Sequence, residues 1–237
     1  MIPKNKVLIW APTLASEPRD MLIRWILTVQ AAGFRNILLV FNGLGAKNAS
    51  AKLSKKFHSR HVQIKWLSGS GSIGKCQAFV TQIFLQSKLL YLLRVDPDGQ
   101  FPIEYAGWLL EPYQSQVDLR PDVVVGFRDE ASIGGRMRYF ANIVLRLFAV
   151  IFGIYADLNC GFYVMNRKAA AFLCRVALPK YPESRMLVSL HKSSLITVSC
   201  LVPVLQRTSG RSSIRGFLQS IRIFLESFLE YLSWDRL

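Results

Sequence analysis

Apolar runs of strand length alternate with helical patterns through the first half of the sequence, and this order constrains the fold more than any other feature. The runs predict strands at Val7–Ala11, Asn36–Phe41, Val62–Leu67, Leu89–Val95 and Val123–Phe127. Segments 19–33 and 75–87, which lie between strands, carry apolar residues at helical spacing. Strands separated by helices favour an α/β domain with a largely parallel sheet, in which ligands bind beyond the carboxyl ends of the strands.

The second half continues with mixed elements. We expect an apolar helix over 139–153, a strand within 159–166, a helix within 167–176, a short helix after the turn at 179–184, and a strand within 194–205. The last segment has apolar residues on one helical stripe. A chain of 237 residues suits one large domain. We therefore expect a single domain over 1–213 and an amphipathic helix over 214–237, which packs on that domain or contacts a membrane.

Composition restricts the classes of partner. The chain has 30 Lys and Arg against 15 Asp and Glu, a net charge of +15, which favours an anionic partner such as nucleic acid, a phosphorylated substrate or an acidic membrane. We rank nucleic acid last, because no nucleic-acid module is recognisable. The four cysteines form no Cys-x-x-Cys pair, so zinc and disulfide frameworks are not expected, and reduced thiols indicate a cytosolic protein.

Neither a secretory signal nor a membrane span is expected. The sequence enters a strand pattern almost at once, without a long apolar segment and a small-residue cleavage site. Segment 139–155 is the most apolar, but Arg146 lies near its middle, and a span needs about 20 apolar residues. A buried helix or a helix at the membrane surface fits this segment better.

One candidate phosphate site is the glycine-rich stretch "GSGSIGKC" at 69–76. It matches the P-loop pattern up to its lysine, but Cys76 stands where a P-loop needs the Ser or Thr hydroxyl that binds magnesium. Gly71 and Gly74 permit a close backbone approach at the start of a helix, where free N–H groups favour anions. We favour a glycine-rich turn between strand and helix over a P-loop.

A second candidate is the stretch "VDPDGQFP", which follows a buried strand. In an extended segment Asp96 and Asp98 point to the same side, and Pro97 disfavours a helical turn between them. Gly99 lets the chain turn, so that Gln100 can return to the same place. Carboxylate and amide oxygens are hard ligands for Mg²⁺ or Mn²⁺, and such an ion can neutralise a departing diphosphate. The alternative is an ordinary Asp-Pro-Asp-Gly turn.

Four stretches in order, from about residue 89 to about residue 214, resemble motifs of the family 2 glycosyltransferases. They are "VDPDGQFP", "VVVGFRDE…GGRMRYFANIVLRLF", "DLNCGFYVMNR" and "PVLQRTSGRSSI". The similarity is nearest to the branch of dolichyl-phosphate mannose synthase and the polyprenyl-phosphate glycosyltransferases. It implies the GT-A (Rossmann-like) fold, a mixed and mostly parallel sheet flanked by helices.

The resemblance also implies a reaction and its residues. A sugar would pass with inversion from a nucleotide-diphosphate donor to a polyprenyl phosphate or a cell-surface glycan precursor, with Mg²⁺ or Mn²⁺ held by Asp96, Asp98 and Gln100. Donor-binding positions would be Pro12, Glu17, Asn42, Gly74 and Asp96, and phosphate-binding positions Arg128, Arg136, Arg138 and Arg207. The catalytic carboxylates would be Asp98, Glu183 and Asp157, of which Glu183 or Asp157 would act as base on a hydroxyl acceptor.

Two positions depart from the family pattern. The Asn-Glu pair expected after the first strand is reduced to Glu17, and the paired acids expected after the second strand are replaced by Asn42. An Asn amide can still pair with the edge of a base. The departures also fit an alternative, a degenerate glycosyltransferase-like binding or scaffold protein without catalysis.

The apolar and basic segments indicate a membrane surface. Helix 139–153 is apolar on nearly all sides, and segment 207–222 contains four arginines and no acid. Helices that lie in the plane of an acidic membrane combine these traits. Packing on the sheet or dimer formation is the alternative. We therefore expect a peripheral enzyme on the cytoplasmic face of the membrane, without nucleic acid and with its oligomeric state open.

Overall fold

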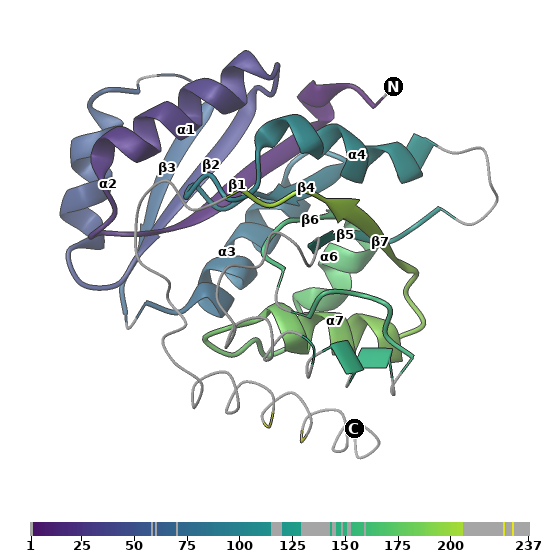
Figure 1. The fold of residues 1–237 in the computed structure, drawn as a ribbon. Coiled ribbons are helices and arrows are strands. Elements are labelled where there is room, and N and C mark those ends of the chain that lie inside the picture. The colour runs from purple at the N-terminus through teal and green to yellow at the C-terminus, as the bar shows by residue number, and fades with distance from the viewer. Residues whose placement is uncertain are drawn as a thin grey trace.

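Seven strands form a single mixed sheet in a computed structural model (Figure 1). The structure describes residues 2–57, 59, 61–69, 71–114, 120–128, 143, 146, 147, 149, 150, 153–158, 160–205, 225 and 229. The strands are β1 (Val7–Leu14), β2 (Asn36–Asn42), β3 (Val62–Leu67), β4 (Tyr91–Arg94), β5 (Val123–Arg128), β6 (Tyr163–Asn166) and β7 (Thr197–Val202). They lie in the order β3-β2-β1-β4-β6-β5-β7. Only β6 runs antiparallel to its neighbours, so the mostly parallel sheet is confirmed.

Helices cover both faces of the sheet. They are α1 (Arg19–Ala31), α2 (Ala46–Ser54), α3 (Ile73–Gln86), α4 (Ala106–Leu110), α6 (Arg167–Leu173) and α7 (Glu183–Lys192), with short 3-10 turns at Lys4–Lys6, Ile103–Tyr105 and Glu111–Gln114. Helices α3, α6 and α7 lie together below the sheet in Figure 1, and α1, α2 and α4 lie on the other side. Coverage on both faces explains why β1 and β2 are nearly continuous apolar runs.

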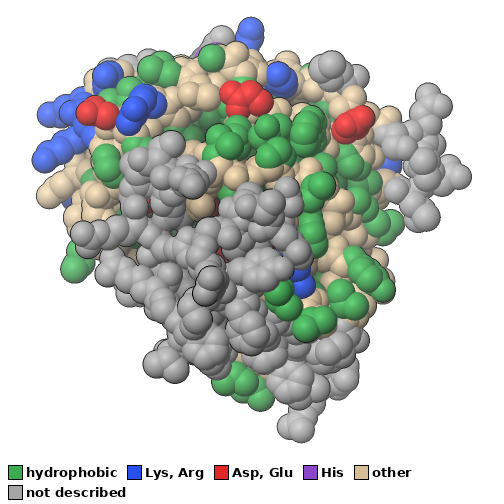
Figure 2. Space-filling model, in the orientation of Figure 1, with side chains coloured by type: hydrophobic (Ala, Val, Ile, Leu, Met, Phe, Trp, Pro, Cys, Tyr) green, Lys and Arg blue, Asp and Glu red, His purple; other side chains and the backbone are tan. Residues whose placement is uncertain are grey.

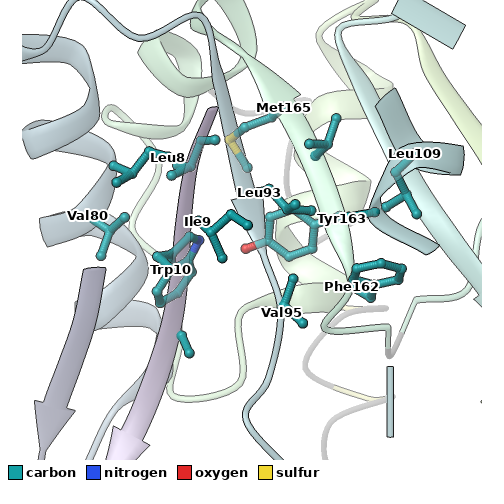
Figure 3. Packing of buried hydrophobic residues seen from close by; sticks show 14 of the residues in the cluster. Leu8, Ile9, Trp10, Val80, Leu93, Val95, Leu109, Phe162, Tyr163 and Met165 are labelled. Carbon is teal, nitrogen blue, oxygen red and sulfur yellow. The ribbon is translucent and has the colours of Figure 1, made fainter. Parts of the chain in front are cut away.

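The core lies between the central strands and these helices. Figure 3 shows Trp10 of β1, Leu93 of β4 and Tyr163 of β6 among its buried members. Val80 of α3 packs into the same cluster. The central strands are therefore held from both sides, which gives their ends fixed positions.

The five predicted N-terminal strands are confirmed, with ends that shift by a few residues. The strands predicted within 159–166 and 194–205, and the helices predicted within 167–176 and after the 179–184 turn, are also present. Helix α2 was not predicted, because its sequence is polar and buries only Ala46, Ser50 and Leu53. Most of the predicted helices 139–153 and 214–237 lies outside the described residues, although the described positions 143, 146, 147, 149, 150, 225 and 229 are helical.

The sheet topology brings several polar residues to one edge. Strands β1, β2 and β4 are parallel, and β5 runs the same way, because β6 is antiparallel to both β4 and β5. Their carboxyl ends therefore lie at the same edge, where Asn42 ends β2, Arg94 ends β4 and Arg128 ends β5. This is the edge at which ligands bind in open α/β sheets.

Candidate active site

Two carboxylates that are far apart in the sequence meet at this edge through one arginine. Arg94 Nε donates to Asp96 Oδ1 over 3.0 Å, and Arg94 Nη1 donates to Glu183 Oε1 over 2.6 Å. Asp96 follows β4, and Glu183 is the first residue of α7. The structure thus joins a predicted metal ligand to the predicted base.

The charge of Arg94 is stabilised by these two carboxylates. Its side chain is 2% exposed, while those of Asp96 and Glu183 are 31% and 11% exposed. Burial opposes a positive charge, but Asp96 and then Glu183 outweigh burial and hold the pKa of Arg94 well above its ordinary value. The three side chains form a buried cation between a partly exposed carboxylate, Asp96, and a nearly buried one, Glu183.

The predicted metal-binding turn is compact. Asp98 Oδ1 accepts a hydrogen bond from the backbone N–H of Gln100 over 3.1 Å, and Gly99 has a φ of 75°. The backbone N–H of Leu205 donates to Gln100 O over 2.9 Å, which ties the turn to the segment after β7. The positive φ explains why a glycine occupies this position.

The donor set of this turn fits a hard cation. In the part of the chain that the structure describes, no group of three or more His, Cys, Asp and Glu side chains could hold a metal ion. The candidate set is instead two carboxylates and an amide, from Asp96, Asp98 and Gln100. Oxygen donors of this kind suit Mg²⁺ or Mn²⁺, which usually keep water or substrate phosphate as further ligands.

A second ion pair lies at the end of β5. Arg128 donates from Nε to Asp157 Oδ2 over 2.6 Å and from Nη2 to Oδ1 over 2.9 Å. Burial opposes the charge of Arg128, but Asp157 outweighs it and raises the pKa of Arg128. Arg146 Nη2 donates to Arg128 O over 2.6 Å, and its guanidinium lies 4.3 Å from the ring centre of Phe127. The two-point contact pairs the buried Asp157 with an arginine whose side chain is 21% exposed.

Asn42 places a buried side-chain amide at the end of β2. Its Nδ2 donates to Cys76 Sγ over 3.0 Å, while its buried Oδ1 has no hydrogen-bond partner among the described residues. Burial raises the pKa of Cys76 to about 11, so its thiol stays protonated at neutral pH. A Cβ on Gly71 would lie 3.3 Å from Asn42 Oδ1, so only a glycine leaves this space open. A buried acceptor beside a glycine can receive an N–H group of a ligand.

Gly74 serves helix packing in this structure. A Cβ at Gly74 would lie 2.0 Å from Pro179 O and 2.8 Å from Leu178 O. The N–H of Ile73 donates to Lys180 O over 3.1 Å, and the Ser72 hydroxyl accepts from the Lys75 N–H to cap α3. This supports the turn between strand and helix that the sequence favoured over a P-loop.

The remaining predicted residues are placed as follows. Pro12 is buried in β1, opposite Val40 of β2. Glu17 Oε2 accepts from the N–H of Leu14 over 3.3 Å in the turn that follows β1. Arg136, Arg138 and Arg207 lie outside the residues that the structure describes.

Arg94 is the site residue that the sequence prediction missed. It lies within the strand predicted at Leu89–Val95 and is the only charged residue in the stretch "LLYLLRV". A lone arginine in a buried strand, two positions before an aspartate, signals a paired charge, because arginine is almost never fully buried without a partner. Its link to Glu183 spans 89 positions and has no local signal.

No protein-family model and no curated protein matches the sequence. Solved structures do resemble it: glucosyl-3-phosphoglycerate synthase from Mycobacterium tuberculosis with Mn²⁺, UDP and phosphoglyceric acid has a TM-score of 0.65 at 14% identity, over 95% of this chain and 78% of the other. The same enzyme with Mn²⁺ and UDP-glucose gives 0.66 at 13% identity, over 94% and 78%. A structure described only as a mycobacterial protein gives 0.66 at 14%, over 94% and 73%. The chain therefore has the Rossmann-like GT-A fold that its motifs implied.

Proposed function

We propose that this protein is a metal-dependent inverting glycosyltransferase that uses a nucleotide-diphosphate sugar. The observation that carries the proposal is the meeting of the turn Asp96–Gln100 with Glu183 at the carboxyl edge of the sheet. Similarity of fold to an enzyme solved with UDP, UDP-glucose and Mn²⁺ or Mg²⁺ supports the same class of donor and ion.

The donor side uses residues at the ends of β2 and β4. Asn42 Oδ1 would accept an N–H of the base, since it is buried and without a partner among the described residues. Asp96, Asp98 and Gln100 would hold Mg²⁺ or Mn²⁺, which would supply positive charge to the departing diphosphate. Of the other predicted donor positions, Gly74 and Glu17 already have packing or turn contacts, and Pro12 lies inside β1.

The acceptor side would use Glu183 and the basic residues. A hydroxyl acceptor needs a base, and we assign this role to Glu183, which shares Arg94 with Asp96. An acceptor phosphate is already ionised and would need cations, a role for Arg128 together with Arg136, Arg138 and Arg207. A phosphate is what a polyprenyl phosphate shares with the phosphoglyceric acid of the similar structure, so a polyprenyl phosphate or a phosphorylated glycan precursor is the proposed acceptor.

We place the enzyme at the cytoplasmic face of a membrane. Among the described residues, no helix is both long enough and apolar enough to span a bilayer. Leu225 and Leu229, which belong to the apolar stripe of the C-terminal segment 214–237, are 48% and 62% exposed. Leu147 and Val150 of segment 139–153 are exposed as well. Exposed apolar residues on helices of a basic chain are what attachment in the membrane plane requires.

Calorimetry with UDP-, GDP- and dTDP-sugars and Mn²⁺ tests the donor. We expect one of them to bind in a metal-dependent way. In Asp98→Ala, binding of the sugar nucleotide should no longer depend on Mn²⁺, and sugar transfer should be lost. The reason is that the change removes a carboxylate of the proposed ion site. An Asp98→Ala protein with full transfer activity would rule out the mechanism.

A scaffold protein without catalysis is the second candidate. It is favoured by Asn42, which replaces the expected acids, and by Arg94, which engages both oxygens of Asp96. If no sugar nucleotide of the panel binds the wild-type protein, this candidate replaces the enzyme.

A further inference from the structure

We propose that Arg94 is a positioning residue that fixes Asp96 and Glu183 relative to each other and so sets the distance between the donor and acceptor sides. The inference rests on the proposed function, because it concerns the residues of that site. Arg94 itself is 2% exposed, so it acts through the two carboxylates and does not reach a ligand.

The guanidinium of Arg94 is held in place by two rings. In the sheet register Arg94 lies beside Trp10 of β1 and beside Tyr163 of β6. Its guanidinium carbon lies 5.5 Å from the ring centre of Trp10 and 5.8 Å from that of Tyr163. Both rings belong to central strands, so the arginine stands on a rigid part of the fold.

Three nitrogens of Arg94 are engaged by two carboxylates. Nε and Nη2 face Asp96 Oδ1 and Oδ2 at 3.0 and 3.4 Å, and Nη1 faces Glu183 Oε1 at 2.6 Å. A planar fork can hold two carboxylates in one fixed geometry, whereas the single nitrogen of a lysine cannot face both in this way. The exposed sides of the carboxylates are left for a ligand, since their side chains are 31% and 11% exposed.

Gly161 leaves the room that this arrangement needs. A Cβ at this position would lie 2.8 Å from Asp96 Oδ2 and 3.1 Å from Arg94 Nη2. The chain before β6 therefore passes against the ion pair without a side chain. Three separate segments (the end of β4, the start of α7 and the chain before β6) thus converge on one guanidinium.

The first experiment measures nucleotide binding rather than turnover. UDP, GDP and dTDP, each with Mn²⁺, are titrated by calorimetry into the wild-type protein, Arg94→Lys and Arg94→Met. For the nucleotide that binds the wild type, we expect affinity to fall about 10- to 100-fold in Arg94→Met, the usual effect of losing a residue that orients a ligand-binding group. Arg94→Lys keeps the charge but should recover only part of this loss.

Arg167→Lys is the matched control. Arg167 donates to the carbonyl oxygens of Phe84, Leu85, Ser87 and Leu89, and it lies against the Phe84 ring. Arg167 is the partly buried first residue of α6. It packs against the C-terminal end of α3, and these contacts are structural. Arg167→Lys should lower the thermal midpoint and leave nucleotide affinity unchanged.

The second experiment tests whether Arg94 couples Asp96 to the start of α7. Hydrogen exchange of residues 183–187 is compared with and without the nucleotide and Mn²⁺. Binding at Asp96 should slow exchange in this first turn of α7 in the wild type and in Arg167→Lys, and not in Arg94→Met. Asp96→Asn combined with Arg94→Met should weaken nucleotide binding no more than Asp96→Asn alone, because Arg94 acts on the bound ion through Asp96.

The outcomes separate the two hypotheses. If the wild type binds none of the three nucleotides, the proposed function fails. If the wild type binds one of them, and Arg94→Met binds it equally and shows the same protection of α7, the inference on Arg94 is overturned. Should Arg94→Met not fold, the comparison of Arg94→Lys with Arg167→Lys decides, since equal nucleotide affinity in those two proteins contradicts the inference.

Discussion

Gly161 gives the sharpest prediction for a single residue. Because glycine has no side chain, Asp96 Oδ2 and Arg94 Nη2 can pack against this position. A methyl group would lie within 3.1 Å of both atoms. Gly161→Ala should therefore lower the free energy of unfolding by about 1–3 kcal/mol, as overpacking does, and weaken nucleotide binding. Urea unfolding measures the first effect and calorimetry the second.

Gly107 provides the control for this substitution. A Cβ there meets no atom of the described residues within 4 Å, and Gly107 lies in α4. Gly107→Ala should leave stability unchanged or raise it by up to about 1 kcal/mol through helix propensity. Equal stability of both variants would show that the space at Gly161 is not limiting.

Cys76 should make the free energy of unfolding fall as the pH becomes alkaline. Burial raises the pKa of its thiol from 9.0 to about 11. The unfolded chain therefore releases this proton at lower pH than the folded protein. The stabilisation that the buried, protonated thiol gives the folded state is complete below pH 9.0 and is lost as pH rises toward about 11.

Removal of the thiol should make the alkaline loss of stability smaller. Between about pH 7.5 and about pH 10.5, the fall in unfolding free energy should be about 2 kcal/mol smaller in Cys76→Ala than in the wild type. Urea unfolding at the two pH values measures this difference. Cys174→Ala, which alters an exposed thiol, should change the fall much less. A Cys76→Ala protein with the same alkaline loss as the wild type would show that this thiol ionises in the folded state.

At the scale of elements, the contact between α3 and segment 178–180 fixes the start of that helix. Gly74→Ala would place a methyl group 2.0 Å from Pro179 O and so must move backbone. We expect a loss of about 3 kcal/mol, at the upper end for overpacking. Lys75→Ala alters an exposed neighbour and should stay within about 0.5 kcal/mol of the wild type. Urea unfolding compares the two, and matching midpoints would contradict the packing described for Gly74.

Elements with a strong local signal could be predicted from the sequence. The strands β1, β2, β4 and β5 are dense apolar runs, β3 alternates apolar and polar residues, and α1 and α3 have clear helical spacing, so both classes of element could be predicted. Helix α2 buries only one large apolar residue, Leu53, besides an alanine and a serine, and α4 has five residues, so neither produces a hydrophobic period.

The same limit applies to the site. The turn at Asp96–Gln100 is encoded by adjacent residues and was predicted. The joining of Arg94 to Glu183 and the packing of Gly74 against Pro179 O depend on contacts between distant segments. The same holds for the burial of Asn42 Oδ1, which has no hydrogen-bond partner among the described residues. Such contacts exist only after the chain has folded, and no local pattern reports them.

At the scale of the whole molecule, charge and exposed apolar residues predict binding to acidic membranes. The net charge is +15, and Figure 2 shows Lys and Arg side chains gathered at the upper left, where Figure 1 shows α1 and α2. The basic residues of these helices include Arg19, Arg24, Lys47 and Lys52. Electrostatic attraction to anionic lipids falls with salt, whereas insertion of apolar side chains does not.

Vesicle co-sedimentation tests this prediction. The protein should pellet with vesicles rich in phosphatidylserine at low salt, less at high salt, and weakly with phosphatidylcholine vesicles. Leu225→Asp with Leu229→Asp should reduce the fraction that remains bound at high salt. Absence of pelleting at both salt concentrations would exclude the membrane-surface assignment.

The strand order of the sheet has a consequence for synthesis on the ribosome. Strands β1 to β4 bond to one another, so this half can assemble once Arg94 has emerged. Strand β5 is made next, yet both of its neighbours, β6 and β7, come later in the chain. Until Asn166 emerges, the nascent chain carries the apolar segment Val123–Val125 with two open strand edges, the form in which strands associate between chains. Premature termination between β5 and β6 should therefore yield aggregating fragments, which chaperones and proteases would have to remove.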